Sequence, residues 1–299
     1  MFSARFLAFV VLIVLLAGVP TTNAQGSWST VTSPTTNWLY SVFMVSANDG
    51  WAVGYSGTIL HYIDGSWRNV ISPTTNSLRS IFMVSARDGW AVGGSGTILH
   101  YTNGSWHTVI SPTTNSLGSV FMVSARDGWA VGGSGTILHY VDGSWSTVTS
   151  PTTSYLFSVF MVSANDGWAV GYWGTILHYN GGSWGAVASP TPYYLLSVFM
   201  VSANDGWAVG YWGTILHYDG DSWRTVTSPT TNYLFSVFMV SANDGWAVEY
   251  SGTILHYTGG SWRTATSPTT NSLHSVFMVN ASDGWAVGTP ILHFTDPTA

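Results

Sequence analysis

Residues 49–62 read DGWAVGYSGTILHY, and the chain repeats this stretch with small changes to its end. A second landmark, Ser-Trp, recurs every 39 residues without insertion, at Trp28, Trp67, Trp106, Trp145, Trp184, Trp223 and Trp262. The last copy of Ile-Leu-His-Tyr, at residues 291–294, comes two residues early and ends in Phe. A period of about 40 residues with several short apolar runs in each unit is typical of a β-propeller.

Each repeat contains four apolar runs separated by turn signals. In the first repeat they are residues 39–46, 51–54, 58–62 and 67–71, and we name these strands a, b, c and d. Asn48-Asp49-Gly50 predicts a hairpin turn between a and b, since these residues tolerate positive φ. Both faces of each run are apolar, as expected for a sheet that is packed between two neighbouring sheets.

The order of the strands predicts how the ring closes. One d strand, residues 28–32, precedes every a strand, and too few residues follow Phe294 to form another. The N-terminal strand is therefore expected to complete the last blade, because an exposed strand edge invites aggregation. We predict an all-β fold, a seven-bladed β-propeller of four-stranded blades with a 39-residue repeat, closed 3+1 by the N-terminal strand. The propeller is expected to span 25–299.

Segment 1–24 has the organisation of a signal peptide. Arg5 gives it a positive start, residues 6–19 are apolar, and Thr22-Asn23-Ala24 fits a cleavage site. The apolar run is short for a membrane span. We therefore expect a secreted or extracytoplasmic monomer with no membrane span after cleavage. A retained anchor, which would place the protein at the cell surface, stays open as the alternative.

The composition of the 299 residues excludes several classes of protein. All seven basic residues are Arg, and the net charge is −6, so no basic stripe for nucleic acid can form. The absence of Cys excludes disulfides and thiolate metal sites. Hydrophobic residues at 46% argue against disorder. An uncharged, aromatic, glycine-rich globular protein remains.

Residues 50–67, Gly-Trp-Ala-Val-Gly-x-x-Gly-Thr-Ile-Leu-His-Tyr followed by Asp-Gly-Ser-Trp, resemble the repeats of bacterial BNR-type propellers related to the photosystem II assembly factor. The spacing of Trp and Gly is similar, more distantly, to tectonin-like lectin propellers. The resemblance covers the whole chain after residue 24, and it implies a propeller that acts as a protein-assembly scaffold, as a lectin or as a sialidase-like glycosidase.

The repeated polar residues favour structural roles over catalysis. Seven strand-c histidines lie too far from the axis to share a metal, so we expect each to hydrogen-bond within its blade: His61, His100, His139, His178, His217, His256 and His293. The Asp of each Asp-Gly-Trp turn is expected to cap its own backbone. The single Glu, Glu249, has no obvious second carboxylate, which a glycosidase needs. We predict no catalytic residue, no metal and no cofactor.

The repeats differ from one another mainly at the d–a and b–c loops, which an alternating meander places on one face. One variable position, at the entry to strand a, reads Trp38, Ser77, Ser116, Tyr155, Tyr194, Tyr233 and Ser272. A second, two residues later, reads Tyr40, Arg79, Gly118, Phe157, Leu196, Phe235 and His274. Aromatic residues concentrate in the fourth and fifth repeats. The predicted ligand-binding residues are Trp38, Tyr155, Phe157, Tyr172, Trp173, Tyr194, Tyr211, Trp212 and Tyr233.

We predict a secreted, non-enzymatic recognition module that binds a glycan or a protein through this aromatic loop face, because Tyr and Trp offer large contact area with a polar tip. A protein-assembly scaffold is the alternative, and a sialidase-like glycosidase is less favoured. The opposing interpretation is drift after recent duplication, with the aromatic side chains only filling loop space.

Overall fold

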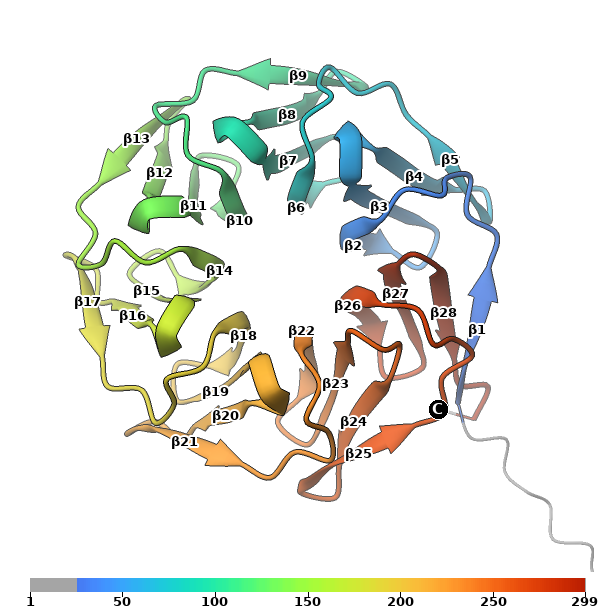
Figure 1. Cartoon of the computed structure of the whole chain (residues 1–299). Helices are drawn as coiled ribbons and strands as arrows, with labels where there is room; N and C mark the ends of the chain where they lie inside the picture. The colour runs from blue at the N-terminus through green and yellow to red at the C-terminus, as the bar shows by residue number, and fades with distance from the viewer. Residues whose placement is uncertain (1–25, 299) are drawn as a thin grey trace, which may run out of the picture.

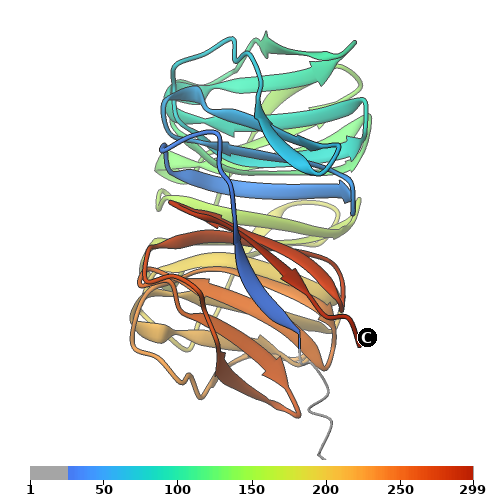
Figure 2. The ribbon, with the colours of Figure 1, turned by 90° about the vertical axis from the view of Figure 1, so that its right-hand side faces the viewer.

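A computed structural model describes residues 26–298. Seven four-stranded antiparallel sheets stand around a central axis as the blades of a propeller (Figure 1). Seen edge-on, the strands run across the thickness of the ring, so that their connecting loops form its two faces (Figure 2). The predicted signal peptide lies outside the described residues.

The strands repeat in the order a, b, c, d from the axis outwards. The a strands are β2 (Leu39–Ser46), β6 (Leu78–Ser85), β10 (Leu117–Ser124), β14 (Leu156–Ser163), β18 (Leu195–Ser202), β22 (Leu234–Ser241) and β26 (Leu273–Asn280). The b strands are β3 (Asp49–Gly54), β7 (Asp88–Gly93), β11 (Asp127–Gly132), β15 (Asp166–Gly171), β19 (Asp205–Gly210), β23 (Asp244–Glu249) and β27 (Asp283–Gly288).

The c strands are β4 (Ile59–Ile63), β8 (Ile98–Thr102), β12 (Ile137–Val141), β16 (Ile176–Tyr179), β20 (Ile215–Tyr218), β24 (Ile254–Thr258) and β28 (Ile291–Thr295). The d strands are β5 (Ser66–Asn69), β9 (Ser105–Val109), β13 (Ser144–Val148), β17 (Trp184–Val187), β21 (Trp223–Val226), β25 (Ser261–Ala265) and β1 (Ser27–Val31). Short 3₁₀ turns join b to c in blades 1 to 5: η1 (Tyr55–Gly57), η2 (Gly94–Gly96), η3 (Gly133–Gly135), η4 (Tyr172–Gly174) and η5 (Tyr211–Gly213).

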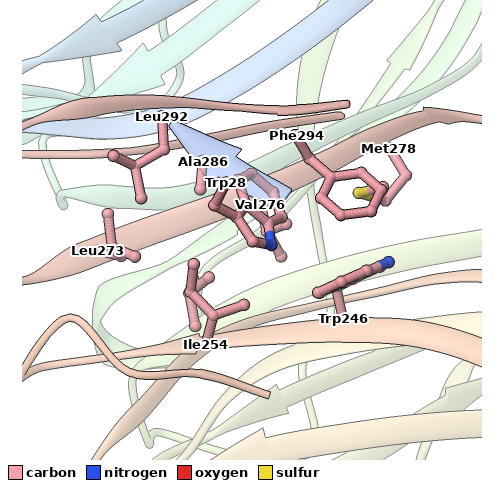
Figure 3. Packing of buried hydrophobic residues seen from close by; sticks show 10 residues of the cluster. Trp28, Trp246, Ile254, Leu273, Val276, Met278, Ala286, Leu292 and Phe294 are labelled. Atoms are coloured by element: carbon pink, nitrogen blue, oxygen red, sulfur yellow. The ribbon is translucent and has the colours of Figure 1, made fainter. Parts of the chain in front are cut away.

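The ring closes through β1, which completes blade 7 in the order β1-β28-β27-β26. Trp28 of β1 pairs with Phe294 of β28 and packs edge-to-face against Trp246 of blade 6, with ring centroids 5.5 Å apart. Figure 3 shows Trp28 among the side chains of both blades. The predicted all-β class, blade count, four-stranded blades and 3+1 closure are confirmed.

The hydrophobic core consists of seven similar clusters, each shared by two neighbouring blades. Trp51 and Ile59 of blade 1, for example, pack with Leu78, Met83 and Trp106 of blade 2. Nearest the axis, seven phenylalanines of the a strands form a closed ring with centroids 4.8–4.9 Å apart: Phe43, Phe82, Phe121, Phe160, Phe199, Phe238 and Phe277. Because the ring of contacts has no end, loss of one blade interface disturbs both of its neighbours.

The a–b turn differs from its prediction. The turn of blade 1 is formed by Ala47 and Asn48, whose amide donates to Ser46 Oγ, and Asp49 already belongs to β3. Gly50 does not have positive φ. A Cβ on Gly50 would lie 2.2 Å from Met44 Sδ, so this glycine is needed for close side-chain packing rather than for the turn.

The two faces of the ring differ in charge. We call the side of the d–a and b–c loops the aromatic face and the side of the a–b and c–d loops the aspartate face. All twelve aspartates lie on the aspartate face: Asp49, Asp64, Asp88, Asp127, Asp142, Asp166, Asp205, Asp219, Asp221, Asp244, Asp283 and Asp296. The aromatic face carries Glu249, which is fully buried, and the exposed Arg79.

Candidate binding site on the aromatic face

The strand-c histidines belong to a repeated structural unit near the aspartate face. His61 Nε2 lies 2.8 Å from Asp49 Oδ1, and the imidazole stacks on Trp51 with centroids 3.9 Å apart. All seven blades repeat the His–Asp contact at 2.7–2.8 Å. The predicted hydrogen bonding of histidine within the blade is confirmed. The predicted aspartate cap is wrong, because the carboxylate bonds to a histidine of the neighbouring strand c.

These histidines and aspartates do not gather into a metal site. Within residues 26–298, no group of three or more His, Cys, Asp or Glu side chains is arranged to hold a metal ion. Each of these seven carboxylates is already engaged by its own histidine, so the repeated unit stabilises the blade.

Glu249 replaces a glycine that the other blades require. A Cβ on Gly54 would lie 2.0 Å from the carbonyl oxygen of Trp38, and Gly210 has the same conflict with Tyr194. The Tyr250 amide lies 3.1 Å from the Tyr233 oxygen, compared with 2.8 Å for the equivalent bond of blade 1 and 3.2 Å in blade 7, which keeps Gly288. The b–c loop of blade 6 also lacks the 3₁₀ turn of blades 1 to 5.

The Glu249 carboxylate is buried and accepts several side-chain hydrogen bonds. Thr230 Oγ1, Asn232 Nδ2 and Ser251 Oγ donate to it at 2.8, 3.0 and 2.6 Å. Burial acts to raise the pKa of Glu249, but the hydrogen bonds outweigh it and hold that pKa below its ordinary value. The group is charged, satisfied and inaccessible, so it offers neither an acid nor a base to a substrate.

Two tryptophans at the tips of b–c loops adopt an uncommon backbone conformation. Trp173 and Trp212 both have φ of 57° and are 70% and 59% exposed. In blades 1 to 3 the same position holds Ser56, Ser95 and Ser134, also left-handed. A bulky residue in the left-handed region is a genuine outlier and costs of order 1 kcal/mol. The fold therefore presents these indoles to solvent at an energetic cost.

The predicted tyrosines form a continuous series of ring contacts, which we call the tyrosine arc. It runs Tyr155, Tyr172, Tyr194, Tyr211, Tyr233, with successive centroids 5.7, 4.3, 4.9 and 4.0 Å apart. Phe157 lies 4.7 Å from Tyr155 at one end. The structure thus brings eight of the nine predicted site residues together, since Trp173 and Trp212 pack edge-on against Tyr194 and Tyr233.

Trp38 lies apart from that group, in blade 1. Its ring contacts His274 of blade 7 at 6.1 Å, and His274 contacts Phe235 at 4.8 Å. Tyr250 then connects Phe235 to Tyr233 through wider contacts of 6.4 and 6.5 Å. Trp38 therefore belongs to the same face but not to the tyrosine arc.

A cavity of about 310 Å³ opens where the central channel meets the aromatic face. Its lining residues come from every blade: Tyr40, Arg79, Gly118, Tyr155, Phe157, Tyr172, Leu196, Tyr211, Phe235 and His274. Gly118 is required here, because a Cβ would lie 3.1 Å from the Tyr155 ring and 2.9 Å from the Leu156 oxygen. We call this space the mouth cavity.

Two further hollows share lining residues with the mouth cavity. One of about 480 Å³, between blades 3 and 4, shares Tyr155 and Tyr172 with it. The other, of about 400 Å³ and lined by Trp38 and Tyr55, shares Tyr40. We call the mouth cavity and these two hollows together the groove of the aromatic face.

The polar groups of the mouth cavity lack protein partners. Arg79 forms no ion pair with any residue of 26–298, and the buried Tyr155 hydroxyl has no hydrogen-bond partner there. Burial raises the pKa of Tyr155, against the opposing effect of Arg79. Burial also lowers the pKa of His274 to about 4, so this imidazole is neutral near pH 7. The cavity offers a cation, a phenol and aromatic walls to a ligand.

The predicted site omits six residues that line this cavity: Tyr40, Arg79, Gly118, Leu196, Phe235 and His274. They occupy the repeat position of Phe157, so the variability of that position was the available signal. The predicted list was chosen for aromatic side chains, mainly in the fourth and fifth repeats, and took only Phe157 from this repeat position, although the ring brings this position of all seven blades to one mouth.

Comparisons with known proteins support the fold. No protein-family model matches the chain, and no curated protein matches it. Among solved structures, YCF48 bound to D1 peptide is 18% identical, with a TM-score of 0.75 over 90% of this chain and 94% of that one. YCF48 from Cyanidioschyzon merolae is 19% identical, with a TM-score of 0.75 over 90% and 98% of the two chains.

A streptogramin B lyase is 16% identical, with a TM-score of 0.80 over 91% of this chain and 98% of that one. At such identities the similarity establishes the propeller and not an activity. The BNR-type and tectonin-like resemblances remain predictions. Residues 26–298 contain no helix long and apolar enough to cross a membrane.

Proposed function

We propose that this chain is a non-enzymatic recognition propeller that binds a segment of another protein in the groove across its aromatic face. The observation that carries this proposal is the mouth cavity, in which Arg79 and the Tyr155 hydroxyl have no protein partner within the described residues. A hydroxyl buried without a partner, such as that of Tyr155, is costly, and ligand sites combine mostly apolar walls with a few polar groups. The exposed guanidinium of Arg79 adds a charge to this set.

The ligand expected from this chemistry is an extended segment with apolar or aromatic side chains and one anionic group. Arg79 is the single exposed charge among the described residues of the aromatic face, and a guanidinium binds a carboxylate with two parallel hydrogen bonds. The apolar side chains of the segment would pack on the tyrosine arc, whose rings bury large area at little entropic cost.

The comparisons favour a protein ligand over the other predicted classes. One similar propeller was solved with a peptide bound, and the photosystem II assembly factor resemblance of the repeats leads to the same proposal of a protein-assembly role. The burial of Glu249 among hydrogen-bond donors and the pairing of the seven strand-b aspartates with histidines argue against a glycosidase. We further propose that the protein acts outside the cytoplasm, as residues 1–24 predict.

A glycan is the second candidate, because two matching aromatic groups are present on the arc. Tyr172, Trp173 and Tyr194 form one, and their equivalents 39 residues later form the other, each with a Trp edge-on to a Tyr at 5.0 or 5.5 Å. Sugar rings stack on exposed indoles and hydrogen-bond to phenols.

The test is binding of short fluorescent peptides, chosen from an array, to the chain lacking residues 1–24, beside a glycan array. Arg79→Met and Phe157→Ala should each weaken binding of a selected peptide by about tenfold, or ~1.4 kcal/mol. Arg126→Met, on the aspartate face, is the matched control and should bind as the parent does. Equal affinity for all three variants, or binding of glycans alone, would refute a peptide site in the mouth cavity.

A further inference from the structure

Large apolar side chains are exposed mainly on one face of the ring. Six aromatic side chains that are 47–70% exposed belong to d–a and b–c loops: Trp38, Tyr55, Trp173, Tyr193, Trp212 and Tyr250. Ile71 and Ile110, at the start of d–a loops, are more than 90% exposed. On the aspartate face only Ile63 and Val141, among the described residues, have comparable exposure.

Exposed side chains at equivalent repeat positions lie at a common level along the axis of the ring. Trp173 and Trp212 occupy the same repeat position, as do Tyr55 and Tyr250, and equivalent positions of a propeller lie at equal height. We call the six exposed aromatic side chains the tips; they come from blades 1, 4, 5 and 6, and Ile110 adds blade 2. Side chains spread around a circle at one level fit a flat surface, whereas a protein hot spot is a compact central cluster.

The charge distribution matches an uncharged, flat partner. The aspartates lie at the far ends of the a and b strands, and eight strand residues span about 25 Å. Charges at that distance are screened in physiological salt, where the Debye length is about 8 Å. Ser, Thr and Asn occupy the positions between the tips, and Arg79 is withdrawn to the channel mouth.

The conformation of the tips gives an independent argument. Trp173 and Trp212 keep left-handed backbones at a position where blades 1 to 3 use Ser, so packing within the ring does not require an indole there. Outliers of this kind are retained at functional sites. Trp and Tyr are also the residues that concentrate at the boundary between lipid headgroups and acyl chains.

We propose that the ring of exposed tips on the aromatic face docks the protein on a neutral, zwitterionic lipid surface, with the aspartate face turned to water. The indoles insert into the headgroup boundary without crossing the bilayer, as in other proteins that lie on membranes. The channel mouth then faces the lipid. This docking goes beyond the proposed function. It shares Trp38, Tyr55 and Trp173 with the two hollows of the groove, but it does not use Arg79 or Phe157 of the mouth cavity, on which the peptide test depends.

The test is flotation of the chain lacking residues 1–24 with phosphatidylcholine vesicles. The triple variant Trp38→Ser, Trp173→Ser, Trp212→Ser puts at each tip the residue that other blades hold there, such as Ser77 and Ser56, so the fold is kept. The double variant Ile63→Ser, Val141→Ser removes the exposed apolar side chains of the aspartate face and is the matched control.

We expect the parent and the control to float with the vesicles. The triple variant should associate with them at least about tenfold more weakly. Added salt or phosphatidylserine should not strengthen binding, because no basic patch takes part. Vesicles with brominated acyl chains should quench tryptophan fluorescence of the parent and the control but not of the triple variant.

Three results would overturn the proposal: a parent that stays in the aqueous fraction, a triple variant that floats as the parent does, or association that requires anionic lipid. A parent that sedimentation shows as a dimer, dissociated by the triple substitution, would assign the tips to a second copy instead. Because peptide binding is measured without lipid and depends on Arg79, failure of lipid docking leaves the peptide site untouched, and the reverse also holds.

Discussion

The two faces of the ring are built from the same seven repeats but changed in opposite ways. On the aspartate face every blade keeps its Asp–His–Trp unit, with His–Asp distances of 2.7–2.8 Å throughout. On the aromatic face the loop tip is Ser in some blades and Trp in others, while its backbone stays left-handed in blades 1 to 5. The difference teaches that the aspartate face maintains the blades, whereas the aromatic face varies side chains on a constant backbone.

The largest expected effect tests whether the variable face depends on that constant backbone. A Cβ on Gly171 would lie 2.2 Å from the Tyr155 carbonyl oxygen, which cannot move without shifting the inner strand. Gly171→Ala should therefore lower the free energy of unfolding by roughly 2–4 kcal/mol, measured by urea denaturation. Gly185→Ala, where the nearest atom is 4.0 Å away, should change it by less than about 0.5 kcal/mol. Equal effects would show that the loop yields freely.

The next prediction concerns pH and the channel mouth. Burial lowers the folded-state pKa of His274 to about 4, below its unfolded value of about 6.5, so the unfolded chain binds the extra proton first. The stability associated with the buried neutral imidazole is fully present above about pH 6.5 and is lost as the pH falls towards 4. Acidifying from about pH 7.5 to pH 5 should cost ~2 kcal/mol of stability through this group.

His274→Phe, which copies Phe157 and Phe235, should reduce that acid-induced loss of stability, as measured by thermal unfolding at the two pH values. His107→Ser, on the exposed outer strand β9, should keep it. If His274→Phe and the parent lost the same stability on acidification, the imidazole would not be buried as described.

A smaller effect should separate the faces directly. Asp205→Ala breaks the 2.8 Å contact with His217 and should cost about 1–2 kcal/mol of stability, with no change in binding at the aromatic face. A double-mutant cycle with His217→Ala isolates the pairwise coupling energy. Coupling near zero, or weakened ligand binding, would contradict a purely structural role for this face.

The smallest effect is expected at a tip of the aromatic face. Trp212→Ser relieves a left-handed bulky residue but removes the edge-on contact with Tyr233, so the two terms nearly cancel. Stability should change by less than about 1 kcal/mol in denaturant melts. A loss well above that would make Trp212 a packing residue and would remove the contrast between the faces.

The sequence predicts the fold well because the repeat spacing counts blades, and the early Trp28 strand shows how the ring closes. It predicts the a–b turn less well, since Asn48-Asp49-Gly50 fits a turn by local preference while the Met44 contact and the His61 hydrogen bond place Asp49 and Gly50 in β3. Local propensity lost here to tertiary packing.

The candidate site is predicted in part. Tyr172 and Tyr194 are recognisable because they differ from the other repeats, and their 4.3 Å contact supports reading them as one group. Arg79 and His274 are far apart in the chain and become cavity neighbours only through ring closure. The left-handed backbone of Trp173 could not be predicted from the residue itself, because tryptophan rarely adopts positive φ. Gly174 after it indicates only that a turn is present.

The closing strand has one further consequence, for how the molecule assembles. β1 and β13 have the same sequence, SWSTV. The side chains of β1 are therefore not specific to blade 7, and β1 of a second molecule would fit blade 7 equally well. What favours self-closure is the effective concentration of β1 held on the same polypeptide. Refolding from dilute solution should give single rings, whereas crowded refolding should exchange β1 between molecules and yield strand-swapped oligomers that separate only on unfolding.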